Sequence, residues 1–299
     1  MSVATFDACV IAAFGRHVLV QDASGRSMKA RPFGRNLVAV CGDEVRCRND
    51  PRHAEVHVLQ VLPRRTALYR SNSRGAAEPV LANVGRLLVV IAPLPPPDPF
   101  VADRYIAAAE SAGIAATLVL NKAELGVDAR LQEQLGVYSA AGYECIAASA
   151  STGEGLEALL ATCAGRIAAL VGQSGVGKSS LVRRLAPEAD VEIGGLMREQ
   201  EGRHTTTASR IYPLAGGGRL IDSPGVRDFA PAIDRLDPRH LGFVEVARLA
   251  PGCRFLDCRH MREPGCAVRQ GIGAGLMDAR RYESYRRLRR LAEELTRRR

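Results

Sequence analysis

Short segments that alternate between apolar and polar residues fill the chain from residue 3 to about residue 70. Glycine, aspartate or proline separates them, which is the pattern of short strands joined by turns. The expected strands are ACVIAAF, HVLVQD, SMKARP, EVRCR and EVHVLQVL. With a GDEV turn at 42–45, they predict an OB-like β-barrel, a fold that often binds RNA. A small barrel without any ligand would have the same pattern.

A different pattern follows a polar, glycine-containing link at residues 70–78. RLLVVIA and IAATLVLNK are apolar throughout, and the helix-like segment DRYIAAAESAG lies between them. Continuous apolar strands that alternate with helices are typical of a parallel sheet covered on both faces. We therefore expect a multidomain α/β protein whose central domain extends to about residue 230.

The last part of the chain combines a cysteine cluster with a basic segment. Apolar and aromatic residues at 282, 285, 288, 292 and 295 recur at helical spacing. The arginines expected to lie largely on exposed faces of this helix are Arg280, Arg281, Arg286, Arg287, Arg289 and Arg290. An RNA-contacting helix fits this arrangement, and a solvated charged face is the alternative. The predicted domains are a barrel at 1–72, an α/β domain at 73–231 and a helical domain at 232–299.

The strongest chemical signal is IAALVGQSGVGKSSLVRRL, which predicts a strand, a loop and a helix in succession. Within it, residues 172–179 match G-x-x-x-x-G-K-[ST], the pattern of a phosphate-binding loop. Its backbone N–H groups surround the phosphates, its lysine neutralises their oxygens and its serine binds Mg²⁺. The residues expected to bind phosphate are Gly172, Gln173, Ser174, Gly175, Val176, Gly177, Lys178, Ser179 and Ser180.

A second phosphate-side motif, DSPG at residues 222–225, follows the predicted hairpin RIYPLAGGGRL. Asp222 ends an apolar strand and is expected to reach Mg²⁺, as Ser179 is. Before the hairpin, GRHTTT supplies hydroxyls where a switch loop would bind the metal, with Thr205 and Thr206 as alternative ligands.

Val226 stands where many GTPases have a glutamine that orients the attacking water. An apolar side chain cannot hold water, so another group or a partner must do so. His204, beside the candidate metal-binding threonines, is the nearest catalytic candidate. A structural or solvent-exposed histidine is the alternative.

The segment NKAE matches a guanine-binding loop. An asparagine amide can bind the O6/N7 edge, a lysine stem can cover the ring, and a carboxylate can accept from N1–H and N2–H. The expected base-binding residues are Asn121, Lys122, Ala123 and Glu124. In the later segment AASAS, the amide of Ala150 is a further candidate for guanine O6. A P-loop ATPase would share the phosphate loop but conflicts with NKAE.

The base loop precedes the phosphate loop, whereas ordinary GTPases have the opposite order. Parallel strands fix such loops at one edge of the sheet wherever the chain begins. The sequence therefore predicts a circularly permuted P-loop GTPase domain.

Four metal-ligating side chains crowd into residues 253–266: Cys253, Cys258, His260 and Cys266. Three thiolates and an imidazole suit tetrahedral Zn²⁺, and four protein ligands leave no open position. We therefore expect a structural zinc in a helical C-terminal domain. Reduced cysteines without metal are the alternative.

Composition narrows the class of protein further. The formal net charge of +9 favours a polyanionic partner such as nucleic acid, although arginine-rich chains are also common without one. The longest apolar runs, such as LLVVIAPL, are too short to cross a bilayer. No basic leader precedes the apolar N-terminal segment, so we expect a cytoplasmic protein.

Together, GQSGVGKSS, GRHTTT, DSPGVRDF, the earlier NKAE and CRFLDCRHMREPGC resemble the ribosome small-subunit-dependent GTPase A family, RsgA. The resemblance covers nearly the whole chain. It implies a bacterial GTPase that docks on the rRNA and proteins of the small ribosomal subunit late in maturation and hydrolyses GTP there. We expect the protein to be a monomer, although no residue pattern indicates its oligomeric state. The resemblance also implies GTP or GDP with Mg²⁺, one structural Zn²⁺, and His204 as the catalytic group. Glu124 departs from the family's aspartate, which bears on guanine selectivity.

A non-enzymatic RNA-binding scaffold that keeps nucleotide as a structural ligand is the rival class. Val226 and Glu124 are the residues that favour it.

Overall fold

The N-terminal strands close into a barrel. The computed structural model describes residues 5–15, 17–34, 37–50, 55–72, 76–187, 209–223 and 230–297. The first strands are β1 (Thr5–Phe14), β2 (His17–Asp22), β3 (Ser27–Pro32), β4 (Glu44–Asp50) and β5 (Glu55–Val61). They pair in the order β1-β2-β3-β5-β4, and β4 pairs again with β1. Inward residues of the alternating pattern, such as Val10 and Val58, are completely buried. The OB-like barrel is confirmed.

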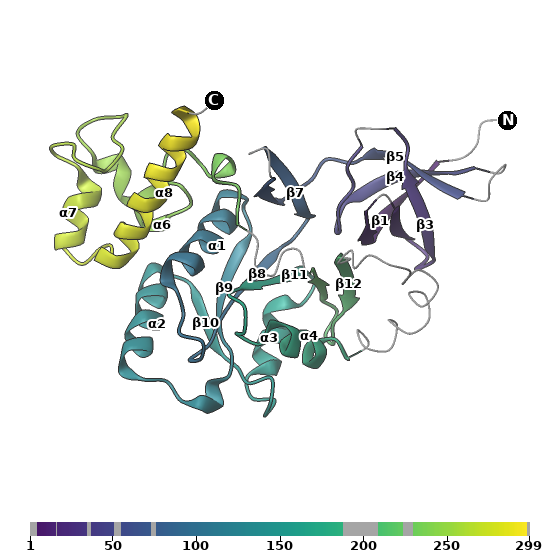
Figure 1. The fold of residues 1–299 in the computed structure, drawn as a ribbon, viewed down its shortest axis with the longest axis horizontal. Coiled ribbons are helices and arrows are strands. Elements are labelled where there is room, and N and C mark those ends of the chain that lie inside the picture. Colours follow the sequence, from purple (N-terminus) through teal and green to yellow (C-terminus); the bar gives the residue numbers. More distant parts are fainter. Residues whose placement is uncertain are drawn as a thin grey trace.

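The stretch 70–78 was interpreted as a simple link, but its described ends belong to two paired strands. Strands β6 (Ala67–Ser71) and β7 (Ala77–Ala82) form a separate two-stranded sheet. Arg70 lies opposite Glu78, with its Nε 2.6 Å from the carboxylate. The polar composition that indicated a linker thus comes from an ion-paired hairpin. In Figure 1, β7 lies between the barrel and the larger sheet.

The other strands build the central α/β sheet. They are β8 (Arg86–Ile91), β9 (Ala115–Leu120), β10 (Glu144–Ala147), β11 (Ile167–Gly172), β12 (Ser209–Pro213) and β13 (Arg219–Asp222). Their order is β10-β9-β8-β11-β13-β12, and β12 is antiparallel to β13 while the other pairs are parallel. This architecture confirms the predicted parallel sheet.

Helices cover both faces of this sheet (Figure 1). They are α1 (Pro99–Ser111), α2 (Ala129–Ala141), α3 (Leu156–Cys163) and α4 (Lys178–Leu185). Alternate residues of β8 point to opposite faces of the sheet and so belong to two different hydrophobic cores. Leu87 and Val89 pack with residues of α1 and α2, whereas Leu88 and Val90 pack with residues of α3 and α4. Because both faces of β8 are buried, its sequence is apolar throughout.

The strand order explains how loops distant in sequence come together. From β8 the chain moves outward through β9 and β10, then returns to β11 on the other side of β8. Strands β8, β9 and β11 are mutually parallel, so their carboxyl ends share one edge of the sheet. Ligands of open α/β sheets bind at such a switch point.

Within the part of the chain that the structure describes, the barrel and the α/β sheet are joined into one sheet of 11 strands. Strand β12 pairs with β1, so that Ala12 lies opposite Arg210 and Ala13 lies opposite Ser209. On its other side, Arg210 lies opposite Asp222 of β13. The candidate magnesium ligand is therefore one strand away from the barrel.

The C-terminal part packs beside α1 (Figure 1). Its elements are η3 (Ile233–Arg235), α6 (Val244–Leu249), η4 (Ala250–Gly252), α7 (Ala267–Gly273) and α8 (Ala279–Arg297). Tyr285 and Leu288 of α8 are buried, and Tyr285 meets Phe243 edge to face. The amphipathic character predicted for this helix is present.

The exposure predicted for the arginines of α8 is wrong at Arg281. Arg287 and Arg290 are exposed, but Arg281 is only 1% exposed. Its Nη1 donates to Asp103 of α1 at 2.8 Å, and its Nε and Nη2 donate to Glu245 of α6 at 2.5 and 2.7 Å. Helical spacing gave no sign of this, because both carboxylates lie on other elements.

Candidate nucleotide site and metal centre

The candidate phosphate loop connects β11 to α4. Gly172, Gly175 and Gly177 all have positive φ, at 145°, 81° and 90°, a region that side chains disfavour. A Cβ on Gly177 would collide with the amide nitrogen of Asn121. The ammonium of Lys178 donates to the carbonyls of Gly172 at 2.6 Å and Gln173 at 2.5 Å, so it lies over the loop. The glycines thus permit both the loop's curvature and its contact with a second loop.

That second loop is NKAE, which follows β9. Asn121 is 1% exposed, and its Nδ2 donates to the carbonyl of Val176 at 2.8 Å. Its Oδ1 accepts from the amide of Ala150 at 3.2 Å. We expected that amide to face guanine O6, but here it orients Asn121. One amide side chain therefore connects the NKAE, AASAS and phosphate loops, and one proton of its NH₂ group is left for a ligand.

Lys122 spans the site from the NKAE loop. Its φ of 60° is in the left-handed region, which is uncommon for a residue with a side chain. Its Nζ donates to Gly175 O at 2.7 Å and to Leu94 O at 2.8 Å. The side chain consequently reaches across to the phosphate loop, which is compatible with the predicted covering of a base.

Leu94 belongs to a segment that borders the site and that the sequence motifs did not indicate. The proline-rich segment PLPPPDP (93–99) follows β8, the strand that lies between β9 and β11. A Cβ on Gly175 would lie 3.4 Å from Pro95, and the amide of Asp98 donates to the side chain of Gln173 at 2.8 Å. The rule that parallel strands end at one edge would have placed this segment at the site.

Glu124 lies with Ala123 in the single turn η1 (Ala123–Leu125). Its Oε1 accepts from the hydroxyl of Ser151 at 2.6 Å. Hydrogen bonds from Ser151 and then Ser149 hold the pKa of Glu124 below its usual value. The carboxylate therefore stays ionised at neutral pH, the form that can accept from the N–H donors of guanine. Sequence reasoning did not find Ser151, which no base-binding motif specifies.

The candidate magnesium ligands lie on neighbouring elements. Ser179 is in the first turn of α4, and Asp222 ends β13. Ala169 of β11 lies opposite Ile221, so Asp222 is at the same edge of the sheet as the phosphate loop. The remaining loop residues of the prediction, Ser174 and Ser180, lie at the tip of the loop and in α4. His204, Thr205, Thr206, Gly225 and Val226 lie outside the described residues.

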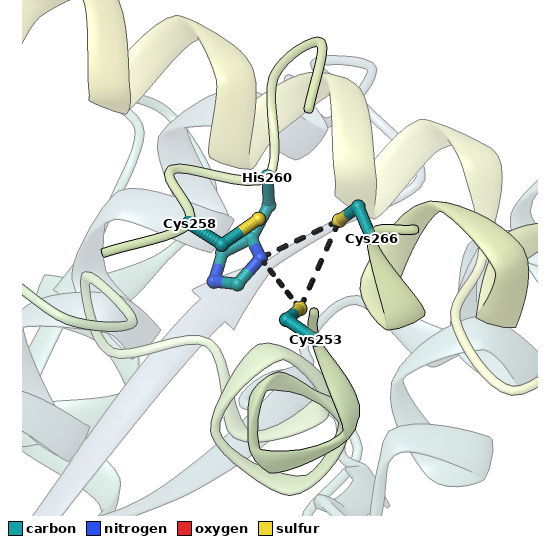
Figure 2. Close-up of side chains that lie close together, drawn as sticks. All are labelled: Cys253, Cys258, His260 and Cys266. Carbon is teal, nitrogen blue, oxygen red and sulfur yellow. Dashed lines mark hydrogen bonds between the residues drawn. The ribbon is translucent and has the colours of Figure 1, made fainter. Parts of the chain in front are cut away.

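The four metal-ligating side chains of the C-terminal part converge (Figure 2). Cys253 Sγ is 3.4 Å from His260 Nδ1 and 4.0 Å from Cys266 Sγ, and Cys266 Sγ is 3.5 Å from His260 Nδ1. With Cys258, all the ligand atoms lie within 4.8 Å of one another. A tetrahedral zinc with bonds of about 2.3 Å to sulfur and about 2.0 Å to nitrogen separates its ligand atoms by about 3.5–3.8 Å. The geometry fits zinc.

The electrostatics of this cluster also suit a cation. Burial, and then the charge of Arg289, lowers the pKa of His260, so its imidazole is neutral and able to ligate. Burial raises the pKa of the Cys258 thiol to about 12. A divalent ion would offset that penalty, because coordination deprotonates a thiol outright. From α8, the hydroxyl of Tyr282 donates to the carbonyl of His260 at 2.7 Å and fixes the ligand's backbone.

These features define a class: a P-loop GTPase in circularly permuted order, with a barrel before it and a zinc-compatible cluster after it. The family model described as RsgA GTPase matches residues 61–231. Small ribosomal subunit biogenesis GTPase RsgA from Azotobacter vinelandii is 42% identical, and that from Pseudomonas fluorescens Pf-5 is 45% identical. Each alignment covers 93% of this chain and 83% of the relative. The chain belongs to the RsgA GTPase family and is a GTP hydrolase.

Solved structures share the fold. YjeQ from Thermotoga maritima is 25% identical, with a TM-score of 0.71 over 98% of this chain and 99% of that one. YloQ, described as a circularly permuted GTPase, is 22% identical and also has a TM-score of 0.71, over 99% and 96% of the two chains. Both likenesses support the order of strands and loops described above. Among the described residues, no helix combines the length and apolar character needed to span a bilayer.

Proposed function

We propose that this chain is a GTPase that binds the small ribosomal subunit, acts in its late maturation and hydrolyses GTP when the subunit stimulates it. The relatives with 42% and 45% identity are named for biogenesis of that subunit, and the chain spans most of their length. The observation that carries the proposal is the 2.8 Å bond from Asn121 to Val176, which holds the candidate base and phosphate loops against each other.

In the proposed complex each loop has a separate role. The backbone amides of residues 172–180 and the ammonium of Lys178 bind the phosphates, while residues 121–124 bind guanine. Ser179 and Asp222 would hold Mg²⁺, which would supply positive charge to the phosphates. Since Lys178 already lies over the loop, its charge needs little rearrangement to reach a phosphate.

We also propose that His204 orients the attacking water, because the apolar Val226 cannot. His204→Ala should lower subunit-stimulated turnover by about 100-fold or more while GDP affinity is unchanged. Full stimulated turnover in the variant would remove His204 from the mechanism.

The flanking regions supply the proposed contacts with rRNA. Phe33 on the barrel is 57% exposed, its ring stacks on His57 at 5.6 Å, and the guanidinium of Arg48 lies 5.9 Å from its centre. Exposed aromatic and cationic groups of this kind stack on unpaired bases. Arg287 and Arg290 of α8 offer positive charge to phosphates. We place the domains at 1–72, 73–231 and 232–299, with a structural zinc in the last.

The proposed setting is the cytoplasm, with the protein as a monomer. None of the eight cysteines forms a disulfide, as expected in a reducing compartment. Light scattering of the purified protein tests the monomer, since a mass near 32.1 kDa is expected.

Turnover of GTP with and without purified small subunits tests the function. We expect strong stimulation by small subunits, little by large subunits, and none with ATP as substrate. Lys178→Ala, which lacks the phosphate-binding ammonium, is the inactive control. If the subunit binds but turnover stays flat, the chain is a nucleotide-binding scaffold and the enzymatic proposal is wrong.

A further inference from the structure

The base-binding and AASAS loops are linked by a chain of hydrogen bonds that includes Glu124. The hydroxyl of Ser151 donates to Glu124 Oε1 at 2.6 Å and lies 3.0 Å from the hydroxyl of Ser149. Ser149 in turn accepts from the amide of Thr152 at 3.0 Å. The carboxylate of Glu124 is thus hydrogen-bonded to a loop that is stabilised by its own internal hydrogen bonds.

The hydrogen bond from Ser151 restricts the Glu124 side chain, which is more flexible than the aspartate usually found at this position. Glutamate has one more rotatable carbon–carbon bond than the aspartate of related sites, and each such bond has three staggered positions. Guanine presents N1–H and N2–H side by side, so a carboxylate must stay in one place to accept from both. An exposed glutamate without a tether would be spread over several positions.

We propose that Ser151 is a positioning residue that determines base specificity: its hydroxyl holds the longer side chain of Glu124 where the carboxylate can accept from guanine. The inference rests on the proposed function, in which Glu124 faces the base. The hydrogen bond from Ser151 still allows the Glu124 carboxylate to accept hydrogen bonds from guanine, because an ionised carboxylate has about four lone-pair sites. Ser151 does not touch the base in this arrangement and acts through Glu124.

The contact made by the neighbouring Ala150 makes it possible to distinguish this role of Ser151 from a general contribution to the structure of the site. Ala150 donates its amide to Asn121 at 3.2 Å, so the backbone of the same loop orients the other base-binding side chain. Removing only the Ser151 hydroxyl leaves that amide in place. Ser151→Ala should therefore affect recognition of the guanine N1–H and N2–H groups and spare contacts that Asn121 makes.

The test compares GDP with inosine diphosphate, which lacks the 2-amino group, in competition with a fluorescent GDP analogue. The full-length chain and its Ser151→Ala, Glu124→Asp and double variants are used. Ser151→Ala should bind GDP about tenfold more weakly, the loss expected for one hydrogen bond to a charged group, and discriminate less against inosine diphosphate. The double variant should again discriminate against inosine diphosphate, because the shorter aspartate does not need the hydrogen bond from Ser151.

Thr152→Ala is the matched control. Its hydroxyl is in the same loop but accepts from the amide of Glu154 at 3.3 Å, away from Glu124. Its ratio of GDP to inosine diphosphate affinity should equal that of the wild type. A wild-type ratio in Ser151→Ala, or a double variant no better than Ser151→Ala, would overturn the proposal. Absence of GDP binding by the wild-type protein would instead overturn the proposed function itself.

Discussion

The guanidinium of Arg281 lies 2.8 Å from the carboxylate of Asp103, although 178 residues separate them along the chain. Asp103 is on α1, one of the helices that cover the α/β sheet, and Arg281 is on α8. Glu245 of α6 completes the group with two further bonds to the same guanidinium. All these side chains are at least 97% buried, so a desolvated ionic cluster fixes the C-terminal helices against the α/β domain.

Arg281→Ala should destabilise the protein by about 3–5 kcal/mol, because it leaves buried carboxylates without their cation. Arg280 still donates to Asp103 at 2.7 Å, so Glu245 is the group left uncompensated. Urea unfolding measures the change. Arg287→Ala, on the same helix but with a 56% exposed side chain, should change stability by no more than about 0.5 kcal/mol. Equal effects in the two variants would show that burial of the cluster contributes nothing.

Gly177→Ala should abolish tight GDP binding while the protein remains folded. The added Cβ would meet the amide nitrogen of Asn121, and the φ of 90° disfavours alanine. Both effects push the base and phosphate loops apart, so we expect at least about a tenfold loss of affinity by titration calorimetry. Gly136→Ala, on α2 where a Cβ meets open space, is the control and should bind GDP normally. Normal binding by Gly177→Ala would mean that the loops need not touch.

The sequence predicted those parts of the structure in which a residue's neighbours follow from its own segment. The barrel strands and β8, which is buried on both faces, were predicted because the pattern of apolar residues along a strand reflects which of its faces are buried. The succession of strand β11, loop and helix α4 was predicted because its glycines and lysine lie within one short segment.

Features that depend on a partner far along the chain were missed. The burial of Arg281 requires Asp103 and Glu245, and the hydrogen bond of Ser151 requires Glu124 in another loop. Neither relationship leaves a periodic pattern. The hairpin at β6 and β7 was missed for a different reason, since its exposed ion pair has the composition of a linker.

The structural zinc proposed above implies that a chelator should loosen the C-terminal part and leave the barrel unchanged. The cluster at Cys253, Cys258, His260 and Cys266 joins η4, the following loop and the start of α7. Without a cation, these partly or fully buried thiols and the imidazole lose the interaction that a structural metal supplies. Hydrogen exchange should increase across residues 253–273 and stay constant in β1 to β5. Exchange that is insensitive to the chelator would argue for reduced cysteines without metal.

Asp237 should make stability depend on pH in the acid range. Hydrogen bonds from the side chain of Arg239, at 3.1 and 3.3 Å, hold the pKa of Asp237 below its ordinary value of 3.8, against the opposing effect of burial. The backbone amide of Arg239 and the charge of His240 act in the same direction. The ionised carboxylate therefore contributes stability above pH 3.8, and this is lost as the pH falls through the lower folded-state pKa.

Asp237→Asn isolates this contribution. Its unfolding free energy in urea should be lower than that of the wild type by under about 1 kcal/mol at neutral pH, because Arg239 is largely exposed. The difference between the two proteins should shrink as the pH is lowered from about 5 to about 3, where the wild-type carboxylate takes up a proton. Protonation of the other acidic groups occurs in both proteins and cancels in the comparison. A difference that is constant or grows toward acid pH would contradict the assignment, because a group with a lowered pKa can stabilise only while it is ionised.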